Sequence, residues 1–208
     1  LNQVVVSASR EAQARTEVPV AISVLSRQTL LDTKPVTLDQ VLNKVSGVNM
    51  VNLGNEQHQM SIRQPITTKS LFLYLEDGIP VRTTGLFNHN ALLEMNMSAV
   101  KNIEVIKGPA SSLYGGEAIG GAINFITPAP SRLPTARVGI HMDNYGYFRT
   151  QFNSSSYLTE KTSYYAGGYV ARQRNGWQTF TDYDKISLNL KVGILADEKT
   201  KITIAFTA

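Results

Sequence analysis

The stretch Asn102-Ile-Glu-Val-Ile-Lys-Gly-Pro-Ala-Ser-Ser-Leu-Tyr-Gly-Gly-Glu-Ala-Ile-Gly-Gly-Ala-Ile-Asn-Phe-Ile-Thr127 decides the fold. It joins an apolar strand, a Gly-Pro turn, a turn of small residues, two glycine pairs and a second strand. Gly108-Pro109 is expected to end the first strand, because proline has no N–H to donate. Phosphate loops need G-x-x-x-x-G-K-[ST] or G-x-G-x-x-G, and neither spacing occurs. We therefore interpret the glycines as positions where backbone packs closely.

Composition excludes several classes of site. The 208 residues contain no cysteine, which rules out disulfides, thiolate metal sites and a cysteine nucleophile. The net charge of +4 comes from scattered residues, so nucleic acid is not an expected partner. No run reaches the roughly 18 apolar residues of a membrane helix, although membrane strands would not produce such a run. The first residues lack a signal-peptide pattern, so we expect a processed or trimmed chain if the protein is exported.

The pattern before residue 128 is that of a compact α+β domain. Strands are predicted at 18–25, 48–51, 60–63 and 71–75, and helices at 27–32, 37–45 and 91–100. Thr37 to Gln40 fits a capping box, and Gly47 is expected to close the helix that follows. Asp77-Gly78 predicts a tight turn after the strand at 71–75.

After a linker that holds three of the eight prolines, long alternating strands begin. About five are predicted, near 138–142, 147–157, 162–171, 186–194 and 202–206, with a longer loop at 172–184. Seven of the nine tyrosines lie beyond residue 144, and tyrosine gathers at membrane–water interfaces. An ordinary antiparallel sheet with one solvated face would show the same alternation. Strands of this length favour a transmembrane barrel, and so few strands cannot close one, so the chain is predicted to be a fragment.

The stretch 102–127 and the pattern around it resemble the plug domain of TonB-dependent outer-membrane transporters. The resemblance runs over about residues 3–127 and continues more loosely beyond. It implies an α+β globular plug followed by the start of an antiparallel transmembrane β-barrel, which has about 22 strands in complete members. The implied domains are a TonB box and N-terminal extension (1–10), the plug (11–128), a linker (129–134) and the first, incomplete barrel strands (135–208). The implied place is the bacterial outer membrane, with the plug in the barrel lumen and the N-terminus in the periplasm.

The N-terminal segment looks like a TonB box, the extended stretch that pairs with TonB. β-Branched residues at a loose terminus can add a strand to a partner's edge. A valine-rich terminus is also typical of an ordinary first strand. The residues implied to bind TonB, which is energised by the inner-membrane proton-motive complex, are Gln3, Val4, Val5, Val6, Ser7, Ala8 and Ser9.

Two cations match positions that lock plug to barrel in the family. Arg63 matches the arginine of an Ile-Arg-Gly motif, and Lys107 matches the arginine that usually precedes Gly-Pro. The resemblance implies that both face carboxylates of the barrel wall. Gln64-Pro65 replaces the usual glycine, and Lys107 lacks the bidentate geometry of arginine, so a looser lock is expected on that side. Solvated strand-end cations are the alternative interpretation.

The resemblance also places a ligand on outward loops at 52–59, 64–70 and 82–90. The implied contacts are amides, histidines, cations and one aromatic ring: Asn52, Asn55, Gln57, His58, Gln59, Lys69, Arg82, Phe87, Asn88, His89 and Asn90. Ordinary hydrophilic loop surface is the alternative. His58 and His89 with Met60 and Met95 also suggest copper ligands, but apolar packing is the default for such methionines, and no metal site is predicted.

No catalytic motif occurs, so an enzyme and a bound cofactor are not predicted. The leading hypothesis is TonB-dependent active import of a scarce bulky solute, a ferric siderophore or similar metal chelate. Its partners would be TonB, outer-membrane lipid and an extracellular small-molecule or chelate ligand. The alternative is a structural or docking subunit that reuses this scaffold and binds accessory outer-membrane proteins. A soluble enzyme is a third hypothesis, which predicts extraction without detergent.

Overall fold

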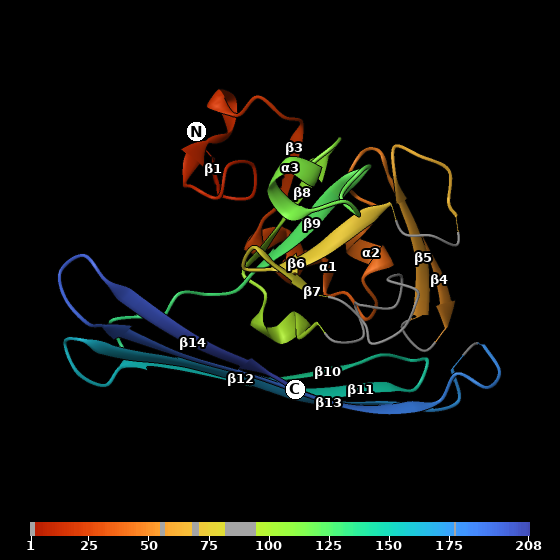
Figure 1. Ribbon diagram of the computed structural model, residues 1–208. Coiled ribbons are helices and arrows are strands. Elements are labelled where there is room, and N and C mark those ends of the chain that lie inside the picture. The colour runs from red at the N-terminus through yellow and green to blue at the C-terminus, as the bar shows by residue number, and fades with distance from the viewer. Residues whose placement is uncertain (1–2, 55–56, 68–70, 82–94, 177) are drawn as a thin grey trace. The chain divides into compact units, whose positions relative to one another are not determined.

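The computed structural model describes residues 3–54, 57–67, 71–81, 95–176 and 178–208. The chain divides into two compact units (Figure 1). The first unit comprises Leu1–Leu93 and Val100–Thr127. The second comprises Glu94–Ala99 and Pro128–Ala208. Each unit is built around a five-stranded sheet of its own.

The first unit is built on a five-stranded mixed sheet with the order β3-β8-β9-β6-β7. Its strands are β3 (Ile22–Leu25), β6 (Phe72–Glu76), β7 (Ile79–Val81), β8 (Asn102–Lys107) and β9 (Gly121–Ile126). β6 and β9 run parallel, and the other neighbours are antiparallel. Phe72, Leu73, Tyr74 and Leu75 are all buried, because β6 lies inside the sheet and is covered on both faces.

The stretch 102–127 forms the centre of this sheet, which confirms the predicted strand–turn–strand. The turn contains one short helix that the prediction lacked, α3 (Ser111–Tyr114). Two backbone bonds close its base, from Gly108 N to Gly120 O at 3.0 Å and from Ala110 N to Ala118 O at 2.8 Å. Gly121 has φ +154°, and a Cβ there would lie 2.2 Å from the Ile106 carbonyl oxygen. The close backbone approach expected of these glycines is therefore present at Gly121.

The predicted helices are partly confirmed. α1 (Arg27–Thr33) begins at Ser26, whose Oγ accepts from Thr29 N at 3.1 Å. α2 (Asp39–Leu42) is only four residues long, and the predicted capping box is wrong. Gln40 Oε1 instead accepts from Val36 N at 2.9 Å. In the described part of 91–100 there is only the 3-10 turn η3 (Met97–Ala99), and residues 91–94 lie outside the described residues.

Two small hairpins complete the first unit. β4 (Val48–Gly54) pairs with β5 (Gln57–Ile62), and both strands are longer than predicted. β1 (Val4–Val5) pairs with β2 (Gln13–Ala14), which leads into the 3-10 turn η1 (Arg15–Glu17). Asp77 (φ 49°) and Gly78 (φ 81°) form the predicted tight turn between β6 and β7.

The second unit is an antiparallel meander of five long strands, as predicted (Figure 1). They are β10 (Thr135–Met142), β11 (Tyr147–Tyr157), β12 (Thr162–Gln173), β13 (Tyr183–Leu195) and β14 (Lys201–Thr207). One face of the sheet exposes large apolar side chains, among them Val138, Ile140, Ile186, Ile204 and Phe206. The other carries small and polar side chains such as Ser155, Ser163, Ser187 and Asn189. This alternation is the period-2 pattern that predicted the strands.

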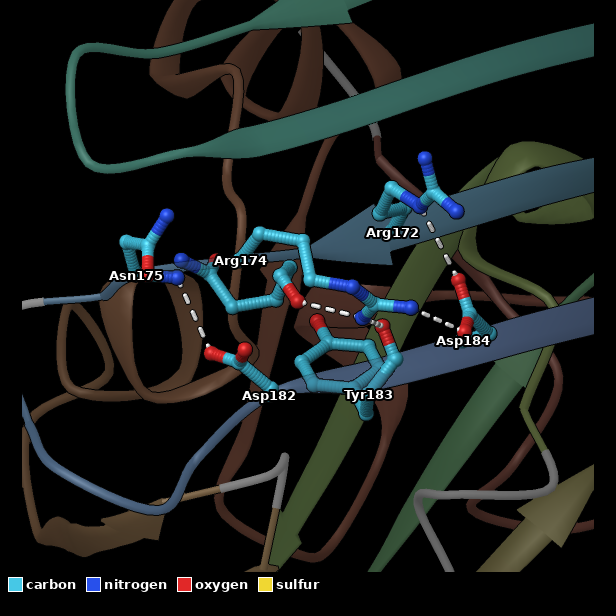
Figure 2. A network of polar contacts seen from close by, with 7 residues as sticks. Arg172, Arg174, Asn175, Asp182, Tyr183 and Asp184 are labelled. Atoms are coloured by element: carbon cyan, nitrogen blue, oxygen red, sulfur yellow. Dashed lines mark hydrogen bonds and ion pairs between the residues drawn. The ribbon is translucent and has the colours of Figure 1, made fainter.

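A polar network closes the long connection between β12 and β13 (Figure 2). Asp184 pairs with Arg172 at 3.3 Å and also with Arg174. Arg174 donates to the Tyr183 carbonyl at 2.8 Å, and Asn175 N donates to Asp182 at 2.9 Å. Exposed ion pairs contribute little stability one by one, so the network mainly fixes where the strands end. In the residues that the structure describes, no helix is long and apolar enough to cross a membrane.

Candidate functional site: the N-terminal segment and its socket

The segment Gln3–Ser9 is part of the first unit and contacts the rest of that unit at several residues. Val4 and Val5 pair with Ala14 and Gln13, and Arg15 N donates to Gln3 O at 2.7 Å. Val5 is only 1% exposed and belongs to a core cluster of this unit, whereas Val4 is 57% exposed. The other members of the cluster are Ile22, Leu73, Leu75, Ile106, Ala110, Tyr114, Ala118 and Ala122. Burial of the Val5 side chain thus supplies the apolar contribution to the docking of the segment.

The polar contribution comes from the side chains that surround Ser7, which is 1% exposed. Ser7 Oγ donates to Glu104 Oε2 at 2.6 Å and accepts from Asn124 Nδ2 at 2.8 Å. Ser7 O accepts from the Tyr114 hydroxyl at 2.7 Å. The same Glu104 carboxylate accepts the backbone N–H groups of Val6, at 3.0 Å, and Ser7, at 2.8 Å. We call Glu104, Asn124 and Tyr114 the Ser7 socket.

Glu104 is 2% exposed, and a buried carboxylate is costly unless its oxygens accept hydrogen bonds. Three of its acceptor contacts come from the N-terminal segment, across almost a hundred residues of sequence. Bonds to a carboxylate are among the stronger ones in proteins. Removal of the segment would therefore leave Glu104 short of donors. The segment and the socket stabilise each other.

Tyr114 is held as a donor toward the segment. Burial raises the pKa of its hydroxyl above the ordinary value, and the nearby Glu104 charge adds to the rise, while Arg10 opposes it. The Arg10 guanidinium carbon lies 5.1 Å from the centre of the Tyr114 ring, and Arg10 Nη2 donates to Leu113 O at 2.6 Å. Arg10 thus fixes the chain just after the segment onto α3.

A cavity of about 350 Å³ lies beside the socket. Its lining includes Val6, Arg10, Asp77, Tyr114 and Asn124. Val6 therefore borders open space while its neighbours Val5 and Ser7 are buried. The segment is held at discrete points and is not packed continuously along its length.

The structure places Arg63 and Lys107, the predicted lock residues, next to each other. Arg63 follows β5 with φ 53°, and its Nη1 donates to the Lys107 carbonyl at 3.2 Å. Arg63 N also donates to Gly47 O at 2.7 Å, so the residue is anchored through its backbone. Its side chain is exposed and Lys107 is half-buried. Both cations are positioned by the same corner of the first unit.

The predicted ligand residues fall into two groups. Asn55, Lys69, Arg82, Phe87, Asn88, His89 and Asn90 lie outside the described residues. Asn52, Gln57, His58 and Gln59 lie in β4 and β5, so their expected placement in a loop is wrong. Alternation in the hairpin leaves Gln57 exposed, and Asn52 donates to Asp39 Oδ1 at 3.4 Å.

His58 is a core residue in this structure. It is 1% exposed, and its Nε2 lies 2.8 Å from the Tyr74 hydroxyl in a hydrogen bond. The Tyr74 hydroxyl also lies 3.7 Å from Met60 Sδ, and burial raises the pKa of Tyr74 well above its ordinary value. Burial and contact with the Tyr74 hydroxyl thus explain the presence of His58 and Met60 at these positions. Over the described ranges, no three His, Asp or Glu side chains come together as a group able to hold a metal ion.

Sequence reasoning missed the Ser7 socket. A signal was present, since Glu104 and Asn124 each interrupt an otherwise apolar strand, in Ile-Glu-Val-Ile and Ala-Ile-Asn-Phe-Ile. A polar residue at a position expected to be buried needs a partner. The identity of that partner was not readable, because it lies near the other end of the unit's sequence.

The TonB-dependent Receptor Plug Domain family matches residues 14–122, more than half of the chain, and the chain belongs to this family. The curated vitamin B12 transporter BtuB of Vibrio vulnificus (strain CMCP6) is 28% identical over 184 residues. That match covers 87% of this chain and 28% of the transporter, so the chain spans little more than a quarter of that relative.

Two solved structures extend the likeness of fold over nearly the whole chain. FpvAI in its complex with pyocin S2 matches with a TM-score of 0.81 at 20% identity, over 97% of this chain and 26% of that one. The alcaligin outer-membrane receptor FauA of Bordetella pertussis matches with a TM-score of 0.80 at 17% identity, over 98% and 34%. The likeness of fold thus covers both the mixed sheet of the first unit and the antiparallel sheet of the second.

Proposed function

We propose that the chain is the plug and the first barrel strands of a receptor that imports a scarce bulky solute across the bacterial outer membrane, driven through TonB. The cargo would be a ferric siderophore or a similar metal chelate. A family relative is a vitamin B12 transporter, and FpvA and FauA are receptors for pyoverdine and alcaligin. The observation that carries the proposal is a short valine-rich strand that is held on a plug by a two-residue strand pairing and by hydrogen bonds at Ser7. Such a strand can be handed to a partner's sheet edge.

The proposal places the protein in the outer membrane, with the plug in the barrel lumen and the N-terminus in the periplasm. The apolar face of β10–β14 would then meet lipid, as outward faces of membrane strands do. The carboxylates that meet Arg63 and Lys107 would belong to the barrel wall. The family is one of receptors and transporters, which supports a role without catalysis.

Replacement of Gln3–Ser9 by a Gly-Ser stretch of equal length is expected to abolish uptake and to leave surface binding intact. The replaced segment would have no strand to offer TonB. The measurement is uptake and binding of radioactive iron carried by catecholate or hydroxamate siderophores, and of cyanocobalamin, by cells that express the full protein. Glu11→Gln, at an exposed position beyond the segment, is the matched control.

Unchanged uptake of a cargo that the unaltered protein imports would refute import driven through TonB by way of Gln3–Ser9. The docking subunit would be favoured instead if the unaltered protein took up none of these cargoes and co-purified with other outer-membrane proteins in stoichiometric amounts.

Arg63→Gly tests the proposed lock without a backbone penalty, because glycine adopts φ 53° freely. Loss of the bond to the Lys107 carbonyl alone is expected to reduce the local opening free energy by about 1 kcal/mol. Loss of a barrel carboxylate contact would add to this. The measurement is hydrogen exchange of β5 and β8 amides in the membrane-embedded protein. Asn175→Gly, at φ 52° in the second unit, is the control, and equal effects of the two variants in β5 and β8 would exclude the lock.

A further inference from the structure

A short piece of chain between two parts of the first unit belongs to the second unit. The first unit breaks off at Leu93 and resumes at Val100, and the residues between them group with the sheet β10–β14. The 3-10 turn η3 in this piece contacts β11 and β12. We call residues 95–99, which the structure describes, the crossover turn. Its place in the sequence alone would assign it to the first unit.

Asn96 connects the crossover turn to the sheet, and this side chain is 3% exposed. Its Nδ2 donates to the Gly167 carbonyl in β12 at 3.1 Å, in a buried bond. Its Oδ1 accepts from Ser98 N at 3.0 Å and from Ser98 Oγ at 2.5 Å. These contacts fix the orientation of the amide, because Ser98 N can only donate and Gly167 O can only accept. Asn96 therefore shapes the turn with its oxygen and binds the sheet with its nitrogen.

The sheet is built to offer its backbone at this point. A Cβ at Gly167 would lie 2.6 Å from the Tyr165 hydroxyl, so the buried Tyr165 side chain occupies the space that a side chain there would need. β12 is paired with β11 on one edge and with β13 on the other. A carbonyl oxygen has two lone pairs, so Gly167 can accept from Asn96 while β12 keeps both pairings. The turn can thus be released without any change in the sheet.

The boundary between the two units at this end of the turn is very short. Ala99 belongs to the second unit and Val100 to the first. Lys101 N already donates to Ile126 O, at 2.7 Å, beside the start of β8. Val100 alone therefore separates the crossover turn from residues that are bonded into the sheet of the first unit. A hinge needs only a few residues that absorb the change in backbone angles.

We propose that Asn96 binds the crossover turn to the second unit, and that this turn stays on the sheet β10–β14 when import moves the first unit, which then pivots at Val100. The binding of the turn by Asn96 is independent of what the protein does. The movement rests on the proposed function, because import is what would drive it.

The test of the first step uses a reporter thiol, which is unique in a chain that has no cysteine. Met95→Cys places the thiol in the crossover turn, where Met95 is 2% exposed. In the membrane-embedded full protein, Asn96→Asp and Asn96→Ala are each expected to speed its labelling by a small thiol reagent about five-fold or more, the effect of one hydrogen bond. Asn96→Asp keeps the acceptor for Ser98 and loses the donor to Gly167, and Asn96→Ala introduces no charge.

Ser98→Ala is the matched control, because it removes a bond within the turn and keeps the bond to Gly167. Met95→Cys should label in Ser98→Ala near the unaltered rate. Equal acceleration in Ser98→Ala and in the Asn96 variants would place the effect inside the turn and overturn the role of Asn96. An unchanged rate in both Asn96 variants would overturn it as well.

Thiols in the first unit test the movement. Met60→Cys in β5 matches Met95→Cys in residue type and burial, since Met60 is 3% exposed, and Ala118→Cys is a second buried position of the first unit. Labelling is compared between cells that import a cargo and the same cells treated with a proton uncoupler. Faster labelling of a first-unit thiol during import, at an unchanged rate for Met95→Cys, is the expected result.

The outcomes separate the two steps. A rise at Met95→Cys equal to the rise in the first unit would show that the turn leaves with that unit, and would overturn the fixed turn. An unchanged rate at both first-unit thiols during import would also overturn the movement. If the cells import no cargo while the Asn96 variants still label faster, the proposed function is refuted and the binding of the turn by Asn96 stands.

Discussion

Gly121→Ala is expected to unfold the centre of the plug sheet, with a loss of about 3 kcal/mol or more from strain at positive φ and from overpacking. A Cβ at Gly121 would lie 2.2 Å from the Ile106 carbonyl oxygen and 3.0 Å from Ile62 Cδ1. The carbonyl belongs to the neighbouring strand β8, so it cannot move without breaking the β8–β9 pairing. The measurement is hydrogen exchange of β8 and β9 amides in the full protein.

Gly116→Ala is the matched control within the same glycine-rich stretch. No atom lies within 4 Å of a Cβ at Gly116, and its φ is not in the left-handed region. In Gly116→Ala, the β8 and β9 amides should exchange at the rates of the unaltered protein. Equal protection of β8 and β9 in both variants would show that close backbone approach is not the reason for glycine at position 121.

Leu75→Ala is expected to cost about 2–5 kcal/mol, because a buried leucine leaves a cavity in a rigid sheet core. Leu75 is fully buried in β6 and belongs to the same cluster as Val5 and Ile106. The cavity would open beneath the N-terminal segment, so Val5 should also lose part of its docking surface. Limited proteolysis of the membrane-embedded protein should show earlier cleavage near residues 3–9 and in β6.

Leu31→Ala on α1 is the control, because Leu31 is 51% exposed and its removal leaves no cavity. The free energy of unfolding of Leu31→Ala should lie within about 0.5 kcal/mol of that of the unaltered protein. If Leu75→Ala loosened the sheet while the N-terminal segment kept its protection, the packing of Val5 would not be needed to hold the segment.

Local pattern predicted the second unit well. In β10–β14 the apolar side chains alternate, and a strand shows alternate residues to opposite faces, so sequence period and structure coincide. The strand–turn–strand of 102–127 was also readable, because Pro restricts the backbone locally and Gly permits the positive φ that turns need. The capping box at Thr37 failed, since a cap depends on how the chain enters the helix, and here Gln40 bonds to Val36 N.

The candidate ligand residues show the opposite case. His58 carries a side chain typical of binding, and its position near a turn suggested a loop. In the structure β5 already begins at Gln57, so His58 lies within the strand. Its side chain points inward and forms a hydrogen bond with the Tyr74 hydroxyl. The face on which a polar residue falls depends on where the strand begins and on what it pairs with. A single sequence does not specify either.

The sequence alone determined the strand–turn–strand of 102–127, the alternating strands after Thr127 and a valine-rich segment able to add to a sheet. Each follows from backbone limits or from periodicity, which act over a few residues. Only the tertiary structure decided that Ser7 lies in a socket of Glu104, Asn124 and Tyr114. These residues are about a hundred positions from Ser7. Burial of the β8–β9 sheet brings them together, and a buried carboxylate then requires the donors that the N-terminus supplies.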